Sequence, residues 1–389
     1  MEFDIDRARK ETPGATKVAH LNNAGAALMP AKVRDAQIRH LRLEAEIGGY
    51  EAADRMRDAI EKVYVSVGDL IGAGDDEIAI VENATVGWDM AFYSIPFKAG
   101  DRILTSEAEY AANYVAFLQV AKRTGAVIET IPSAETGETS VEALKRMLDD
   151  RVKLVAITHV PTNGGLTNPA AEIGAALKDH PALYLLDACQ SVGQMPIDVG
   201  AIGCDMLSAT GRKYLRGPRG IGFLYVRHDL IKTLEPPMID HYAANWTQPD
   251  AYTLRPDARR FENWENNYAA RLGLGIAVDY AREWGLEAIQ TRVRQLAGYL
   301  RDELRAIPTI AVMDIGREQS GIVTFTKADE AGLAVKARMR AQGINISVSH
   351  PGSTLLDATR RNLPPLIRAS VHYYNIEEEI SRLIRLLRV

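Results

Sequence analysis

Cysteine is scarce in this sequence, since only two of the 389 residues, Cys189 and Cys204, are cysteines. This excludes a disulfide scaffold, and we expect a reducing, cytoplasmic setting. Positive charge is not in surplus either, because 46 Lys and Arg residues face 51 Asp and Glu residues. A chain with a formal net charge of −5 lacks the basic footprint of a nucleic-acid-binding protein, so we expect no nucleic-acid partner.

Long apolar runs are also missing, because no stretch approaches the ~18 consecutive residues that cross a bilayer. The first residues, MEFDIDRARKETPG, are charged and contain no apolar signal-peptide core. We therefore expect neither a membrane partner nor secretion. Repeats and low-complexity tracts are absent, and 47% hydrophobic with 25% charged residues is typical of globular domains.

Short apolar runs alternate with longer amphipathic stretches in the middle of the chain. The unbroken apolar run 182–186 is typical of a central strand that is buried on both faces. Amphipathic patterns over 112–123, 141–148 and 170–177 indicate helices between the strands. This alternation predicts an α/β fold with a mostly parallel, seven-stranded sheet. The candidate strands are Glu77–Val81, Arg102–Thr105, Ala126–Ile131, Leu154–Thr158, Leu183–Asp187, Met206–Ala209 and Gly222–Val226.

The remainder of the chain predicts a second, smaller α/β domain. Residues 245–256 are polar and aperiodic, so we expect a long loop there, followed by long helices over 268–307 with a break at Gly285. We expect a large domain over 17–268 and a small C-terminal domain over 269–389, to which the N-terminal segment 1–16 is joined. Its expected elements are strands 311–314, 322–326, 344–348 and 367–374 and helices 331–342 and 376–387, the last with Asn375 as N-cap.

Two residues together suggest a chemistry that neither indicates alone. Asp187 ends the most apolar strand, and ligands of open α/β sheets bind beyond the carboxyl ends of strands. On its position alone, Asp187 also fits a turn residue, and Lys213 also fits a surface lysine. A lysine 26 residues after a strand-end aspartate is the arrangement that pyridoxal phosphate needs. The lysine holds the aldehyde carbon, and the aspartate keeps the pyridine nitrogen protonated.

Five motifs carry a resemblance to a known family from about His20 to the C-terminus. They are EAEYAAN at 107–113, ITHVPTNGG at 157–165, LLDACQSVGQ at 185–194, TGRKYLRGPRG at 210–220 and IRASVHYYN at 367–375. In these motifs the sequence resembles the class V aminotransferase group of fold type I pyridoxal-phosphate enzymes. That group includes cysteine desulfurases, selenocysteine lyases, isopenicillin-N-epimerase-like proteins and hercynylcysteine sulfoxide lyases. The resemblance implies pyridoxal 5'-phosphate as cofactor and a homodimer with shared active sites.

The resemblance assigns roles around the cofactor ring. Lys213 matches the Schiff-base lysine, Asp187 the carboxylate on the pyridine nitrogen, and Gln190 the side chain near the ring hydroxyl. Tyr110 stands where desulfurases carry a histidine stacked on the ring. An aromatic phenol can stack equally well, and its hydroxyl could also move protons.

The phosphate site that the resemblance implies is split between two segments. Ala84 and Thr85 lie between a strand and a helix, where backbone N–H groups favour an anion, although Ala84 can contribute only its backbone. Thr210 and Arg212 match the phosphate contacts ahead of the lysine. The partner chain commonly contributes through the segment that is 260–267 here, in which Glu265 replaces the typical hydroxyl residue.

The resemblance also implies a substrate site. Arg368 matches the arginine that binds the α-carboxylate of the substrate, a task that suits a planar guanidinium. Either Thr162 or Asn163 occupies the position of a second carboxylate contact. Asn23, in the segment 21–25, resembles a residue that folds back toward the substrate. No metal site is expected.

One expected residue of the desulfurases is absent. They carry a nucleophilic cysteine on a mobile loop ahead of the carboxylate-binding arginine, and here the loop 347–354 contains none. A protein persulfide is therefore not expected, and His350 is either a plain loop residue or a proton donor to the leaving group. We predict a lyase that cleaves a carbon–sulfur bond in a cysteine-like amino acid or S-conjugate by Cα deprotonation and β-elimination. An epimerase or an aminotransferase is the alternative, and a non-enzymatic scaffold is the least favoured reading.

Overall fold

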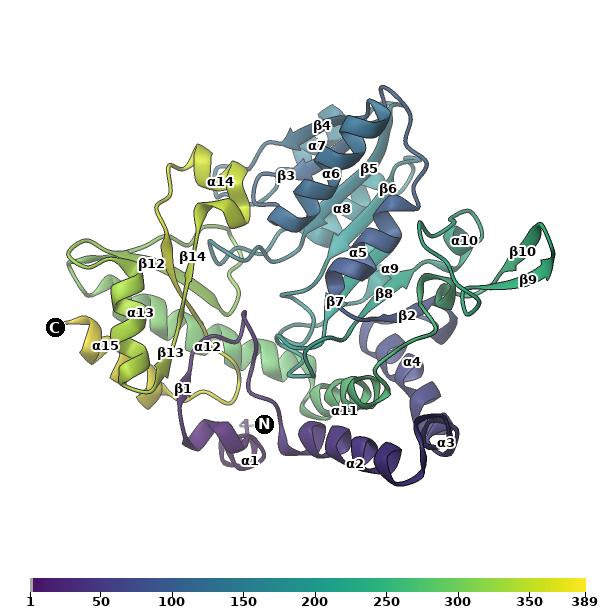
Figure 1. Cartoon of the computed structure of the whole chain (residues 1–389). Helices are drawn as coiled ribbons and strands as arrows, with labels where there is room; N and C mark the ends of the chain where they lie inside the picture. Colours follow the sequence, from purple (N-terminus) through teal and green to yellow (C-terminus); the bar gives the residue numbers. More distant parts are fainter. Residues whose placement is uncertain (1–2) are drawn as a thin grey trace.

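The structure is a computed structural model that describes residues 3–389. Its centre is a seven-stranded sheet with strand order β2-β8-β7-β6-β5-β3-β4 (Figure 1). Only β8 runs antiparallel to its neighbours, β7 and β2, so the predicted mostly parallel, seven-stranded sheet is confirmed. The strands are β2 (Ile78–Val81), β3 (Arg102–Ser106), β4 (Val127–Ile131), β5 (Val152–Thr158), β6 (Leu183–Asp187), β7 (Met206–Thr210) and β8 (Gly222–Val226).

Helices cover both faces of this sheet, which explains why its central strands are apolar throughout. Along β5, Leu154 and Ala156 join the apolar cluster on one face, whereas Val155 and Ile157 join the cluster on the other. The helices that follow the strands are α5 (Ala84–Tyr93), α6 (Ala111–Thr124), α7 (Val141–Met147), α8 (Ala170–Leu177), α9 (Val199–Ile202) and α10 (His228–Ile231). Because the parallel strands share a direction, the carboxyl ends of β5, β6 and β7 meet at one edge.

A second, four-stranded antiparallel sheet has the order β11-β12-β15-β14. Its strands are β11 (Ile310–Val312), β12 (Ile322–Lys327), β14 (Ser347–Ser349) and β15 (Leu366–Ser370). The helices around it are α12 (Leu286–Arg305), α13 (Gly332–Ala341), α14 (Leu355–Arg360) and α15 (Glu377–Leu387). Of the described residues, no helix combines the length and the apolar character needed to cross a membrane.

The N-terminal segment links the two sheets. After α1 (Ile5–Lys10), the short strand β1 (Ala19–His20) pairs in parallel with β13 (Ile344–Asn345). The chain then forms α2 (Ala31–Ile47), α3 (Gly49–Arg55) and α4 (Arg57–Ile71). Helix α11 (Tyr268–Trp284) packs against α2 and α4, whereas α12 packs against β11, β12 and α15. These contacts favour a domain boundary at Gly285, within the long helical stretch, and the two-domain division remains our proposal.

The predicted long loop over 245–256 is wrong. These residues form a hairpin of β9 (Ala244–Gln248) and β10 (Ala251–Leu254), which projects from the body of the molecule (Figure 1). Trp246 and Tyr252 are exposed on it. Neither face of the hairpin is buried, so the sequence carries no apolar period, although the turn at 249–250 and the aromatic and Thr residues favour strands.

The last predicted strand and helix also need correction. The strand expected over 367–374 ends at Ser370, because Tyr373 and Tyr374 form a turn between His372 and Asn375: the His372 N–H donates to Asn375 Oδ1 at 2.8 Å. Asn375 is therefore occupied in this turn, and Ile376 is the N-cap of α15. The strand expected over 344–348 is divided into β13 and β14, which belong to different sheets.

Candidate active site

Asp187 lies at the carboxyl end of β6 and is buried. Its Oδ1 accepts the N–H of Cys189 at 2.9 Å, and its Oδ2 accepts a hydrogen bond from Asn113 Nδ2 at 3.0 Å. The first bond closes the turn after the strand, and the second comes from the first turn of α6. Two bonds from different elements therefore fix the orientation of this carboxylate.

Lys213 lies in the loop after β7, close to the other predicted site residues. Burial lowers its pKa, and the positive charges of Arg212 and Arg368 lower it further, whereas Asp187 raises it. Within residues 3–389, no hydrogen bond or ion pair to Nζ is found. The lysine is thus an amine with a lowered pKa that no protein group holds, which suits a nucleophile or a base.

Arg368 is held in position on β15 by its neighbours. Its Nε donates to Ser347 Oγ at 3.1 Å, across the β14–β15 pair. Its Nη1 donates to the carbonyl oxygen of Thr162 at 3.2 Å and also to the Thr162 hydroxyl. Burial lowers the pKa of Arg368, but a guanidinium stays charged. A fixed, desolvated cation of this kind suits a carboxylate ligand.

The two candidates for a second carboxylate contact have different surroundings. Thr162 touches Arg368, whereas the Asn163 side chain donates to Thr354 Oγ1 at 3.1 Å, at the end of the segment 347–354. The Oδ1 atom of Asn163 is buried and has no donor in the described part of the chain. Thr162 is therefore placed to orient the guanidinium, and both residues remain predicted substrate contacts.

Asn23 fastens the N-terminal segment beside β15. Its Nδ2 donates to the Ser370 carbonyl at 2.7 Å and to the His20 carbonyl at 3.1 Å, and its Oδ1 accepts from the Tyr374 hydroxyl. The side chain is fully buried. Its polar atoms are used by the protein itself, so its contact with substrate stays a prediction.

The two halves of the predicted phosphate site lie side by side. Gly222 pairs with Thr210, and a Cβ atom at Gly222 would lie only 3.2 Å from the Ala84 nitrogen. In α5, the Asn83 side chain accepts a hydrogen bond from the N–H of Val86. The N–H groups of Ala84 and Thr85 have no intrahelical acceptor, because they stand at the start of the helix. The start of α5 and Thr210 therefore lie close together, as the predicted anion site requires.

The residues predicted to surround the cofactor ring, Tyr110 and Gln190, lie near Arg212 in the same cluster. Tyr110, the N-cap residue of α6, is 40% exposed and contributes to the electrostatic surroundings of both Arg212 and Arg368. Arg212 donates to the Gly25 carbonyl, and Gln190 Nε2 donates to the Ala24 carbonyl at 3.1 Å. Gln190 Oε1 is buried but has no donor in the region that the structure describes.

These observations test whether the residues fit pyridoxal phosphate. The cluster offers an unengaged buried amine at Lys213, a fixed carboxylate at Asp187 and an unpaired amide oxygen at Gln190. It also offers an anion site at the start of α5 and an arginine for a second anion. These groups fit the aldehyde, the pyridine nitrogen, the ring hydroxyl and the phosphate of that cofactor, and the carboxylate of an amino acid.

A sequence model of the family described as Aminotransferase class-V matches residues 19–383. The chain belongs to the class V aminotransferase family. The match spans nearly the range over which the five motifs suggested it.

Two proteins similar to this class V chain are cysteine desulfurases, and a third is a cystine C–S lyase. A cysteine desulfurase of Salmonella agona (strain SL483) is 30% identical over a 402-residue alignment, which covers 99% of this chain and 97% of the relative. The apo structure of a cysteine desulfurase from Thermococcus onnurineus NA1 superimposes with a TM-score of 0.92 at 25% identity and covers 100% of this chain and 98% of the other. The cystine C–S lyase C-DES, solved with its reaction product cysteine persulfide, gives a TM-score of 0.87 at 25% identity, covering 97% and 99%.

Neither cysteine of this family member is built as a nucleophile. Burial raises the pKa of the Cys189 thiol well above its usual value, and the charge of Asp187 raises it further. Burial likewise raises the pKa of Cys204, which lies just before β7. The thiolate is the reactive form, so both groups are inert near neutral pH. The segment 347–354, which we expected to be a loop, consists of β14 and a short 3-10 helix over Pro351–Thr354, and between them it presents an exposed His350.

The sequence analysis missed Glu109 and Asn113, although both belong to the motif EAEYAAN. Asn113 Nδ2 donates to Asp187 and also to Glu109 Oε1 at 2.8 Å, so the two residues form a support behind the predicted pyridine partner. Their spacing of four residues at the start of a helix, with apolar residues beyond, was the available signal. Ser347, which holds Arg368, gave no such signal.

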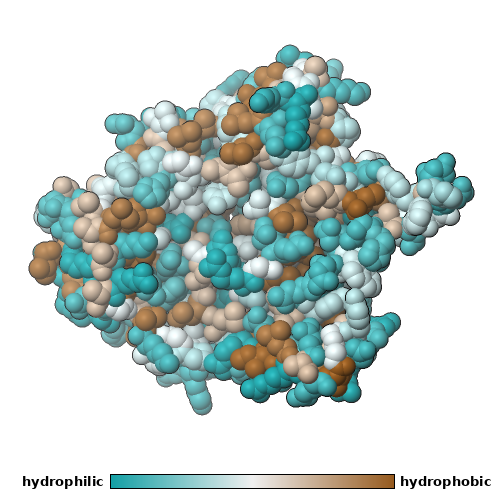
Figure 2. Space-filling model, in the orientation of Figure 1, coloured by the Kyte–Doolittle hydropathy of each residue, from teal (hydrophilic) through white to brown (hydrophobic). Residues whose placement is uncertain are grey.

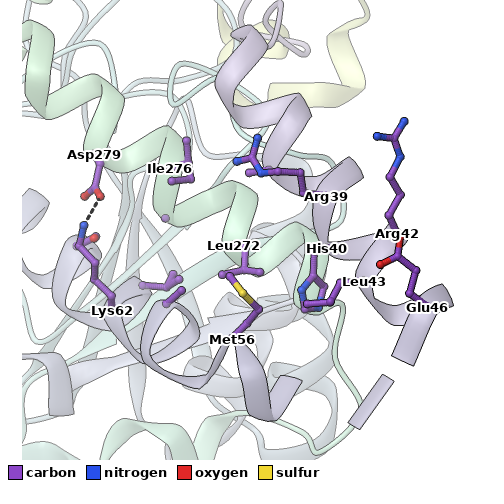
Figure 3. A pocket seen from close by; sticks show the side chains of 15 residues that line it. Arg39, His40, Arg42, Leu43, Glu46, Met56, Lys62, Leu272, Ile276 and Asp279 are labelled. Carbon is purple, nitrogen blue, oxygen red and sulfur yellow. Dashed lines mark hydrogen bonds and ion pairs between the residues drawn. The ribbon is translucent and has the colours of Figure 1, made fainter. Parts of the chain in front are cut away.

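A separate groove lies on the surface away from these residues. It has a volume of about 620 Å³ and is formed by α2, α4 and α11 (Figure 3). Leu43, Met56, Leu272 and Ile276 contribute apolar side chains, and Lys62 and Asp279 form an ion pair at 2.9 Å at one end. It contains none of the predicted site residues, so it is not the site of the chemistry.

Proposed function

We propose that the protein is a pyridoxal-phosphate-dependent lyase that cleaves the Cβ–S bond of cysteine, cystine or a cysteine S-conjugate. The observation that carries the proposal is the combination of a complete amine–carboxylate–guanidinium cluster with a segment, 347–354, that contains no thiol. The relatives named as cysteine desulfurases and as a cystine C–S lyase act on sulfur-containing substrates of this kind, which supports the proposal.

In this proposal, Lys213 holds the cofactor, Asp187 pairs with its ring nitrogen and Gln190 with its ring hydroxyl. Ala84, Thr85, Thr210 and Arg212 hold the phosphate. Tyr110 lies on the ring face. When bound, the cofactor withdraws electrons from the Cα atom of the substrate.

The protein's own residues perform the remaining work. Arg368, oriented by Ser347 and Thr162, binds the α-carboxylate and fixes the Cα–H bond relative to Lys213. The lowered pKa of Lys213 favours the neutral amine, so it takes the Cα proton as a general base, which typically contributes ~10²–10⁴-fold. The Cβ–S bond then breaks, and sulfur leaves with the bonding electron pair. With one water consumed, the products are a thiol, pyruvate and ammonia, or a persulfide in place of the thiol when cystine is the substrate.

The test is incubation of the holoenzyme with cysteine, cystine and S-alkyl and S-aryl cysteine conjugates. Pyruvate and thiol, or persulfide, are expected in equal amounts. Alanine with released sulfur would instead show a desulfurase. An inverted α-carbon, or amino transfer that depends on a keto acid and yields no pyruvate, would show the epimerase or aminotransferase alternative.

We also propose that the protein is a cytoplasmic homodimer. Leu41 and Met238 are exposed apolar residues beside Glu265 and the start of α5, in one open hollow next to the proposed phosphate site. Figure 2 shows further apolar residues gathered over α11 and α2. A patch of neighbouring exposed apolar side chains commonly marks a protein–protein interface.

Light scattering coupled to size exclusion tests the dimer. Leu41→Asp and Met238→Asp should shift the wild-type dimer toward monomer, because a charge in an apolar interface leaves an unpaired ion. Leu333→Asp is the matched control, since Leu333 is 59% exposed on α13, away from this hollow. A wild-type monomer would contradict the proposal.

A further inference from the structure

Two buried carboxylates lie on either side of a single amide. Asp187 ends β6, and Glu109 directly precedes the N-cap residue of α6. Asn113 Nδ2 donates one hydrogen to Glu109 Oε1 at 2.8 Å and the other to Asp187 Oδ2 at 3.0 Å. Glu109 is 3% and Asp187 6% exposed. The amide therefore uses both of its hydrogens to connect the two acids.

Glu109 has neutral partners only. Its Oε1 also accepts the N–H of Tyr110 at 2.9 Å and the hydroxyl of Thr158 on β5, and its Oε2 is 2.9 Å from Thr105 Oγ1 on β3. Within the described range 3–389, no Lys, Arg or His pairs with it. The charged group that acts on it is Asp187, and Lys213 acts on Asp187 in turn.

Two like charges that share one buried amide resist simultaneous ionisation. Burial, and then the charge of Asp187, raise the pKa of Glu109 to about 7, although the hydrogen bonds from Thr158 and Asn113 oppose this shift. Oε1 already accepts three donors, so the proton resides on Oε2. The Thr105 hydroxyl donates to Oε2 when the carboxylate is ionised, and it has to rotate to accept from the protonated acid.

We propose that Glu109 is a positioning residue that holds a proton in the apoprotein and releases it to solvent when the cofactor's positively charged ring nitrogen pairs with Asp187. The inference rests on the proposed function, because it takes Asp187 as the partner of that nitrogen. A cation beside Asp187 offsets the negative charge that opposes ionisation of Glu109. Glu109 then supports Asp187 with a second negative charge and still holds Asn113 and the Tyr110 backbone in place.

The experiment is calorimetric titration of the apoprotein with pyridoxal phosphate in two buffers of different ionisation enthalpy, which counts the protons released per cofactor bound. Wild type is compared with Glu109→Gln, whose amide reproduces the protonated acid: its oxygen accepts the same donors and its NH₂ faces Thr105. Lys213 and the cofactor titrate alike in both proteins. We expect wild type to release about 0.5 proton more than the variant at pH 7, since half of Glu109 is protonated there. The difference should fall below about 0.1 near pH 8.5.

Glu107→Gln is the matched control. Glu107 lies two residues upstream and forms an ion pair with Arg360 at 2.9 Å, outside the Asn113 network. It should release the same number of protons as wild type. Equal counts for wild type and Glu109→Gln at pH 7 would overturn this inference alone, whereas no binding heat in wild type would overturn the proposed function and the inference together.

An infrared difference spectrum of the wild-type protein provides a second measurement that needs no variant. Cofactor addition at pH 7 should remove a carboxylic acid C=O band that corresponds to about half an acid group per chain, since half of Glu109 is protonated there. If that band is absent from the apoprotein, or persists after binding, the inference fails even where Glu109→Gln does not fold.

Discussion

The two sides of the proposed substrate site are built differently. On the Asp187 side, side chains from β3, β5, β6 and α6 are buried and hydrogen-bonded to one another. On the other side, the segment 347–354 presents the exposed His350 and no thiol. The difference indicates that the chain fixes the predicted cofactor-binding groups more firmly than the segment around His350.

Lys213→Ala should have the largest effect, because it removes the amine from the fixed side. Activity should fall by at least about 10³-fold, since general base catalysis typically contributes ~10²–10⁴-fold and the covalent anchor is lost too. The visible absorbance near ~420 nm that lysine-bound pyridoxal gives should also disappear. Activity assays and absorption spectra check this, with the exposed Lys232→Ala as control. An unchanged spectrum would refute the assignment.

Arg368→Gln should have the next largest effect. It removes a buried, oriented cation, and loss of one partner of such a charge pair costs about 2–5 kcal/mol, which is roughly 30- to 5,000-fold in kcat/KM. The loss should lie mainly in KM, because the carboxylate is bound before and during the reaction. Steady-state kinetics measure it, and the exposed Arg385→Gln should match wild type. A loss confined to kcat would contradict a carboxylate-binding role.

We expect Glu109, the buried acid next to Asp187, to make the stability of the apoprotein depend on pH. The pKa of Glu109 rises from 4.5 to about 7 on folding, so the folded state binds more protons in this range and stability falls as the pH rises through it. The loss should be about 3 kcal/mol. Glu109→Gln should therefore gain melting temperature relative to wild type at about pH 8 and lose this advantage near pH 4. Parallel melting curves at both pH values would contradict the expectation.

His350→Ala should have the smallest effect, since His350 is exposed. We expect a change of less than about 3-fold in kcat, far below the ~10²-fold that a positioned general acid supplies. The comparison should use one S-alkyl and one S-aryl conjugate. A large loss that is restricted to the S-alkyl substrate, whose thiolate is the poorer leaving group, would show that His350 protonates the departing sulfur.

The large sheet could be predicted from the sequence because its strands are buried on both faces. Strands 183–187 and 222–226 and helix 170–177 have the predicted bounds. The β9–β10 hairpin could not be predicted, because it buries neither face and so has no apolar period. A segment with a buried face shows a hydrophobic pattern from which its structure can be predicted, whereas a segment that buries neither face shows none.

The candidate site shows the same division. Lys213, Asp187 and Arg368 stand in motifs with distinctive spacing, and the structure brings them together. Glu109 and Asn113 were missed because their importance depends on a contact between α6 and β6, across 74 residues of sequence. Such a contact follows from the order of the strands in the sheet, which a single sequence does not contain.

The pairing of β1 with β13 has a consequence for how the protein is made. Residues 19–20 find their partners at 344–345, and Arg216, near Lys213, donates to the Tyr373 hydroxyl at 2.6 Å. These partners emerge from the ribosome only after the whole central sheet has been made, and non-local contacts of this kind form late. A nascent chain that has finished its central sheet still cannot complete the pocket, so vitamin capture must wait until the segment up to Tyr373 has been made.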